Sequence, residues 1–119
     1  MNKPDIFNLI HSEEVLETIP QRIGIPDDDF IYREEIKAIY KIALAQHVSV
    51  TFIQIAGPDE LEHFSKYMDS ALKLDPILTF EDLCMEFVLN YPNLKDRIFA
   101  TIPAFTDEFI NTYKNIANS

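Results

Sequence analysis

The stretch that decides the fold reads DFIYREEIKAIYKIALAQHVSVTFIQIA and spans residues 29–56. No other segment is so long and so apolar. In its first half, apolar residues recur at spacings of three and four, which predicts an amphipathic helix. Asp29 is placed to accept the free amide hydrogens of the first turn. We expect the flanking helices to pack on an inward stripe made of Ile36, Ile39, Tyr40, Ala43 and Leu44.

The second half of the stretch has a different pattern of apolar and polar residues. Val48, Val50 and Phe52 alternate with polar residues, a pattern typical of a strand. One helix over the whole stretch would be roughly 40 Å long, whereas a compact chain of this size has a radius of gyration of about 13–14 Å. We therefore expect a break near His47. Because no other segment alternates, a strand would lack a neighbour, so 48–55 is predicted to be a second helix.

The charged residues of the first half indicate how that helix faces water. Arg33, Lys37 and Lys41 recur every four residues, and we expect them on the water face opposite the apolar stripe. Glu34 lies three residues before Lys37, the spacing of a helical ion pair.

Prolines and capping residues divide the rest of the chain into short helices. Ser12 is a predicted N-cap, Pro58 a first helical residue, and Thr79 the start of a capping pattern with Asp82. The helices are predicted to begin at Pro4, Ser12, Pro58, Phe80, Leu94 and Thr106, with a loop over 20–28. The predicted fold class is all-α, one compact bundle-like domain of six to eight short helices over residues 1–119. The alternative is an α+β fold with a strand at about 48–55, paired across a dimer.

Charge and composition exclude several classes of function. The formal net charge is −10, which argues against nucleic acid as a direct ligand because phosphate binding needs a basic face. The sequence has no apolar run of membrane-spanning length and no signal-peptide pattern, so we expect no membrane partner and a cytoplasmic protein. A single cysteine excludes an intrachain disulfide, and two glycines leave little for a phosphate loop or an oxyanion loop.

Two short patterns resemble sites of chemistry, and each has a simpler explanation. Glu60 and His63 have the spacing of a di-iron ligand pair, but there is no second copy of the motif, so we interpret them as part of a solvated helix face. Cys84 lies between apolar residues near Glu81, Asp82 and Glu86, which favours core packing over a reactive thiolate. No catalytic, cofactor-binding or metal-binding residue is predicted.

The segment 27–35 is the strongest candidate for a binding site. It combines five carboxylates with two aromatic residues at a loop-to-helix junction, and adjacent like charges repel one another. A capped helix start explains Asp29 and the two glutamates, but explains Asp27 and Asp28 less well. The segment lacks the central glycine of a calcium-binding loop. The predicted partner-binding residues are Asp27, Asp28, Asp29, Tyr32, Glu34 and Glu35.

These observations favour a small acidic binding protein that neutralises or masks a basic protein partner. An immunity protein or antitoxin against a toxin such as a nuclease fits the size, the acidity and the lack of catalytic motifs. An inhibitor that mimics the charge of nucleic acid fits them too. The alternative is a structural or regulatory helical module whose acidity serves solubility.

Overall fold

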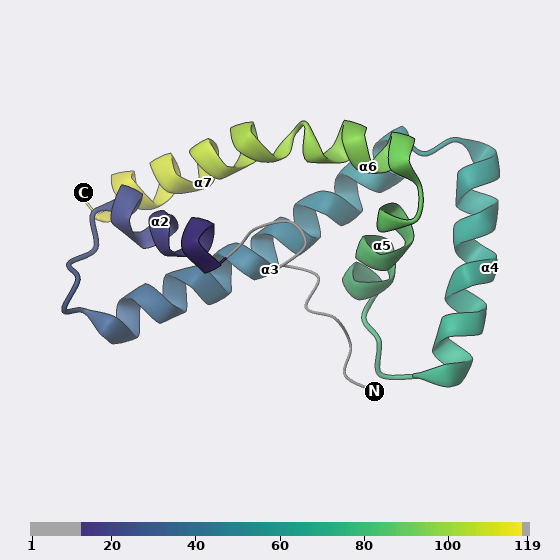
Figure 1. The fold of residues 1–119 in the computed structure, drawn as a ribbon, viewed down its shortest axis with the longest axis horizontal. Helices are drawn as coiled ribbons and strands as arrows, with labels where there is room; N and C mark the ends of the chain where they lie inside the picture. The colour runs from purple at the N-terminus through teal and green to yellow at the C-terminus, as the bar shows by residue number, and fades with distance from the viewer. Residues whose placement is uncertain (1–12, 118–119) are drawn as a thin grey trace. The chain divides into compact units, whose positions relative to one another are not determined.

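The computed structural model describes residues 13–117, and these residues form helices joined by short connections (Figure 1). No strand occurs among them, which confirms the all-α prediction and excludes the strand at 48–55. The predicted helix 4–11 and the N-cap at Ser12 lie outside the described residues. The described helices are α2 (Glu13–Ile23), α3 (Phe30–Ile55), α4 (Pro58–Leu74), α5 (Phe80–Leu89), α6 (Pro92–Phe99) and α7 (Ile102–Ala117).

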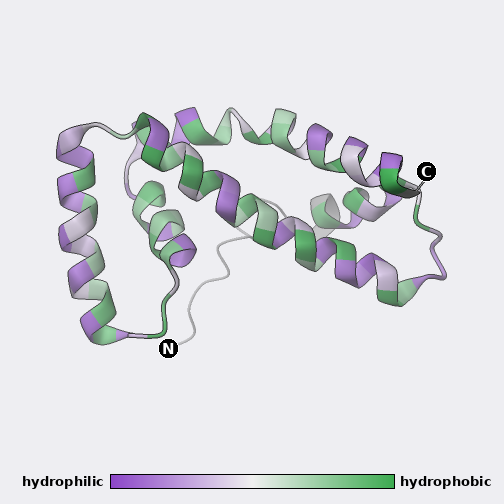
Figure 2. Cartoon of the chain, turned by 180° about the vertical axis from the view of Figure 1, so that it is seen from behind, coloured by the Kyte–Doolittle hydropathy of each residue, from purple (hydrophilic) through white to green (hydrophobic). Residues whose placement is uncertain are grey.

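The central stretch forms one uninterrupted helix, so the predicted break near His47 is wrong. Leu44, Val48 and Phe52 are fully buried at four-residue spacing, whereas Val50 and Ile53 are exposed. The apparent alternation therefore comes from two faces of one helix, and Figure 2 shows hydrophobic residues on more than one side of α3. Backbone contacts group the chain into two units, and residues of α3 belong to both.

The first unit comprises the described parts of Met1–Ala43 and Pro103–Ser119. Its core contains Tyr40, which is fully buried and whose ring centroid lies 5.3 Å from that of Phe109. Of the predicted inward stripe, Ile36, Tyr40 and Leu44 are buried, Ala43 is half-buried and Ile39 is exposed. Helix α2 continues through the buried Pro20 to Ile23, so the predicted loop is confirmed only from Gly24 onward.

The second unit is Leu44–Ile102 and has an aromatic core. The ring centroids of Phe52, Phe64 and Phe87 lie 5.1–5.6 Å apart. Helix α4 begins at Pro58 as predicted. The capping pattern before α5 is confirmed as well: the Asp82 amide donates to Thr79 Oγ1 at 3.1 Å and the Thr79 amide donates to Asp82 Oδ2 at 3.3 Å.

The C-terminal helix starts earlier than predicted. Helix α7 begins at Ile102 and not at Thr106, with Pro103 in its first turn, where a missing amide hydrogen costs no helical hydrogen bond. Thr106 is instead a buried residue of the helix interior. Among residues 13–117, no helix combines the length and apolar content needed to cross a bilayer. The expectation of a single domain stays a prediction.

Candidate functional site

A sharp reversal after α2 places the acidic segment at the surface. Gly24 has φ of +98°, and its amide donates to the Pro20 carbonyl at 3.1 Å. The next amide, that of Ile25, donates to the same carbonyl at 3.0 Å, and the Ile25 side chain is buried. The chain is thus fixed to the core just before the three aspartates. A left-handed backbone conformation of this kind favours glycine.

The start of α3 is capped as the sequence predicts. Asp29 Oδ1 accepts a hydrogen bond from the Tyr32 amide at 3.3 Å, and the Asp29 carbonyl accepts one from the Arg33 amide at 3.1 Å. The side-chain hydrogen bond from Asp29 satisfies the Tyr32 amide, which lies in the first turn and has no partner within the helix. Asp29 therefore has a structural role that does not depend on any partner.

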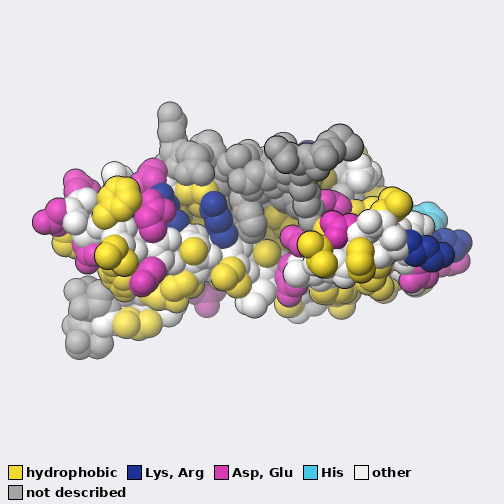
Figure 3. Space-filling model, turned by 90° about the horizontal axis from the view of Figure 1, so that it is seen from below, with side chains coloured by type: hydrophobic (Ala, Val, Ile, Leu, Met, Phe, Trp, Pro, Cys, Tyr) yellow, Lys and Arg dark blue, Asp and Glu magenta, His cyan; other side chains and the backbone are white. Residues whose placement is uncertain are grey.

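The predicted partner-binding residues lie together on this loop and the first turns of α3. Five of the six are exposed, and Tyr32 is half-buried. Figure 3 shows acidic side chains (magenta) around hydrophobic ones (yellow) at the left of the view, where α3 begins in Figure 1. We call the exposed set the junction surface; its residues are Asp27, Asp28, Asp29, Phe30, Ile31, Glu34 and Glu35.

Two members of the junction surface were missed as binding residues in the sequence. Phe30 is 71% exposed and Ile31 is 76% exposed, so both are better placed than Tyr32 to anchor a partner. The helical period could have predicted the exposure of Ile31. Ile31 lies five residues before the buried Ile36, and at about 100° per residue this spacing places Ile31 on another face of α3. Neither side chain contributes much to the core of its own unit.

Arg33 and Lys37 lie beneath the junction surface, so the prediction that they face water is wrong, and Lys41, the third predicted water-facing cation, is half-buried. Arg33 is 9% exposed and donates to Asp27 Oδ1 at 3.3 Å, to Glu17 Oε2 at 3.4 Å and to the Ile25 carbonyl at 3.3 Å. Lys37 is 8% exposed; it pairs with Glu17 and, at 3.1 Å, with Glu34. The predicted Glu34–Lys37 pair is thereby confirmed.

These contacts shift the titration of the two groups at the centre of the network. The hydrogen bond from Lys37, opposed in part by desolvation, lowers the pKa of Glu17 below its ordinary value. The hydrogen bond to Glu17 raises the pKa of Lys37. Both groups therefore stay charged over a wider pH range than they would in water. The network holds Arg33 and Lys37 in place below the carboxylates.

The other residues considered for chemistry, Glu60, His63 and Cys84, do not come together in a site. Glu60 Oε1 accepts from the Gly57 amide at 2.9 Å, whereas His63 Nδ1 lies 3.2 Å from the Tyr91 hydroxyl. Within the described residues, no three side chains of metal-binding type come together. Cys84 is fully buried, and burial raises the pKa of its thiol to about 11. It is a core residue, as the sequence indicated.

Comparisons with known protein families, with characterised proteins and with solved structures find no match to this chain.

Proposed function

We propose that this chain is a binding protein that masks a basic protein partner through the junction surface. The observation that carries the proposal is an inversion of the usual arrangement of side chains. At the start of α3 the two cations are buried, while Phe30 and Ile31 are exposed among carboxylates. A helix start that served only stability would bury the apolar residues and leave the lysine in water.

The two kinds of exposed group would contribute differently to binding. Carboxylates facing a basic partner raise the association rate by about 10- to 1000-fold at low salt. Burial of a side chain such as Phe30 or Ile31 is worth about 1.5–3 kcal/mol when complete. The charges would thus set the speed and orientation of the encounter, and the apolar pair would hold the complex. A few well-buried side chains usually carry most of the binding energy of an interface.

The kind of partner follows from the charge. A protein that binds nucleic acid needs a basic face, and a surface of closely spaced carboxylates complements such a face. We therefore infer an immunity protein or antitoxin that covers the nucleic-acid-binding face of a toxin such as a nuclease. The carboxylates at 27–29 and 34–35 would take the place of phosphates.

A specific observation favours the alternative of a structural or regulatory helical module. Asp27 and Glu34 already pair with Arg33 and Lys37, and Asp29 caps α3. Only Asp28 and Glu35 have no such local role in the described contacts. Under this alternative the acidity serves solubility, and charge reversal of Asp28 and Glu35 changes no interaction.

The test uses these two residues because their replacement leaves the cap and the ion-pair network intact. The purified chain is used to capture proteins from its native lysate at low and at high salt, and a recovered basic protein is then purified and titrated directly. We expect Asp28→Lys with Glu35→Lys to slow association by about tenfold or more. The matched control is Asp69→Lys with Glu108→Lys, two exposed acidic residues outside the junction surface.

Three results would contradict the proposal. One is equal binding by the two charge-reversed variants, which would indicate an unspecific polyanion effect. Another is capture of many basic proteins without preference. The third is full affinity of a Phe30→Ser variant for the purified partner, because the apolar pair would then have no role.

A further inference from the structure

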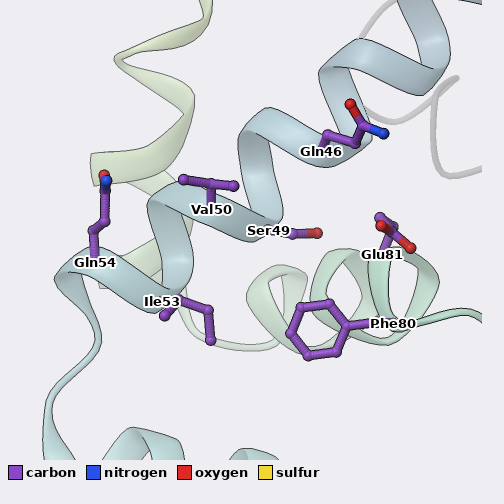
Figure 4. Close-up of a pocket in the computed structure, with 7 residues that line it drawn as sticks. All are labelled: Gln46, Ser49, Val50, Ile53, Gln54, Phe80 and Glu81. Atoms are coloured by element: carbon purple, nitrogen blue, oxygen red, sulfur yellow. The ribbon is translucent and has the colours of Figure 1, made fainter.

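The second unit carries an open apolar groove of about 420 Å³ that the proposed function does not use. It lies between the last turns of α3 and the start of α5, and Figure 4 shows the two segments facing each other. Three apolar residues at this groove are well exposed: Val50 at 56%, Ile53 at 48% and Phe80 at 44%. The groove is lined by Gln46, Ser49, Val50, Ile53, Gln54, Phe80 and Glu81.

The groove has no buried, unpaired polar side chain that would fix a small polar ligand in one orientation. Ser49 is buried, and its hydroxyl donates to the Ala45 carbonyl at 2.9 Å. Across the described residues, no buried side-chain nitrogen or oxygen lacks a hydrogen-bond partner. The groove is therefore suited to an apolar surface, as in the packing of an amphipathic helix into a groove.

The low charge of the groove indicates which kind of protein surface would bind there. Glu81 is the one charged residue in the lining, although the chain as a whole carries a net charge of −10. A strongly basic partner would be attracted to the carboxylate-rich junction surface and not to this groove. The complementary surface is nearly uncharged, apolar and able to pair with side-chain amides.

One edge of the groove is itself nearly uncharged, with an apolar residue between two side-chain amides. Gln46, Val50 and Gln54 follow one another at four-residue intervals and so form one row along α3. If two copies of this row meet antiparallel about Val50, Gln46 of each copy lies opposite Gln54 of the other. A glutamine amide carries both donors and an acceptor, so two such amides can pair with each other. The row is thus complementary to itself, which is the requirement for a two-fold interface.

We propose that a second copy of this chain docks on the groove and forms a two-fold dimer. The row Gln46–Val50–Gln54 packs against its symmetry mate, and Ile53 and Phe80 close the apolar interface on each side. Two chains of charge −10 repel each other, and contact through their least charged surface keeps that repulsion small. Salt screens the repulsion between the copies, so the dimer should tighten as salt is added. Binding of a basic partner should weaken with salt.

The experiment is sedimentation of the purified chain from micromolar to millimolar concentration, at low and at high salt. We expect a species of twice the 13.8 kDa chain mass that becomes more populated with concentration and with salt. Val50→Glu places two carboxylates at the symmetry axis and should raise the dimer dissociation constant by about 100-fold or more. The matched control is Leu74→Glu, a change at a more exposed apolar residue that does not line the groove. This control should dimerise like the unaltered chain.

Crosslinking gives an independent measurement of the same arrangement. Val50 lies at the proposed axis, so Val50→Cys should form a disulfide-linked dimer rapidly under mild oxidation, whereas Leu74→Cys should not. The native Cys84 is fully buried and should not compete. A monomer at every concentration, a dimer insensitive to Val50→Glu, or equal crosslinking of the two cysteine variants would overturn the proposal. None of these results would affect the proposed role of the junction surface.

Discussion

A buried hydrogen bond between Tyr40 and Thr106 joins α3 to α7 in the first unit, and its removal has a calculable cost. The Tyr40 hydroxyl lies 2.7 Å from Thr106 Oγ1, and both residues are buried. In Tyr40→Phe the ring keeps its packing against Phe105 and Phe109, with centroids 6.1 and 5.3 Å away. The change therefore removes a polar contact and creates almost no cavity.

The expected loss of unfolding free energy for Tyr40→Phe is about 1–3 kcal/mol, because the Thr106 hydroxyl stays buried without its tyrosine partner. The lower end applies if that hydroxyl turns to a carbonyl one turn earlier on α7. Thr106→Val preserves the shape of the residue and should cost a similar amount. In the double variant both hydroxyls are gone, so its loss should be clearly smaller than the two single losses together.

Urea unfolding followed by far-ultraviolet circular dichroism measures the four free energies of this cycle. We expect the double variant to deviate from additivity by about 1–2 kcal/mol, well beyond the roughly 0.3–0.5 kcal/mol found for independent sites. Additive losses, or single variants as stable as the unaltered chain, would refute the reasoning. The hydrogen bond would then contribute nothing to holding α7 on α3.

Two predictions concern titratable groups of the second unit. Burial lowers the pKa of His47, whose Nε2 lies 2.7 Å from Thr101 Oγ1, below its ordinary value of 6.5. The unfolded chain therefore takes up this proton first, so stability should fall as pH drops below 6.5, and His47→Gln should reduce that dependence in urea titrations at several pH values. Cys84, with its pKa raised to about 11, should react with a thiol reagent at pH 8 only as fast as the unit opens. Labelling of the native chain as fast as of the urea-unfolded chain would contradict this.

Local signals in the sequence predicted the helix boundaries well where capping or proline decided them. Asp29, Pro58 and Thr79 each take the position expected from their short-range chemistry. These signals work because a cap or a first-turn proline acts within three residues of itself. At Pro20, buried in the interior of α2, the tertiary packing overrides the local preference of proline.

Long-range pairing could not be predicted in the same way. Lys37 has the helical spacing of a water-facing row with Arg33, but also that of the inward row through Tyr40 and Leu44. The position of Glu17 on α2 makes the second arrangement favourable, since Glu17, together with Glu34, pairs with the buried ammonium group. The sequence contains Glu17 but not its place in space.

The sequence predicted the acidic residues of the candidate site but not the exposed apolar residues Phe30 and Ile31. Three consecutive aspartates before a helix are visible in any reading of the sequence. The exposure of Phe30 and Ile31 depends on which face of α3 the core takes, and the apolar residues on several sides of that helix leave the choice open.

Gly24 is harder to replace in the course of evolution than the acidic residues that follow it, because of its backbone conformation. Its φ of +98° is the one positive value among the described residues, and a side chain there is strained even though no atom lies within 4 Å of the added carbon. The carboxylates that follow it are held by no comparable backbone requirement. Asp28 and Glu35 have neither a capping role nor an ion pair in the described contacts, so they can be exchanged without loss of the helix cap or the ion-pair network, whereas the residue at position 24 has to stay glycine.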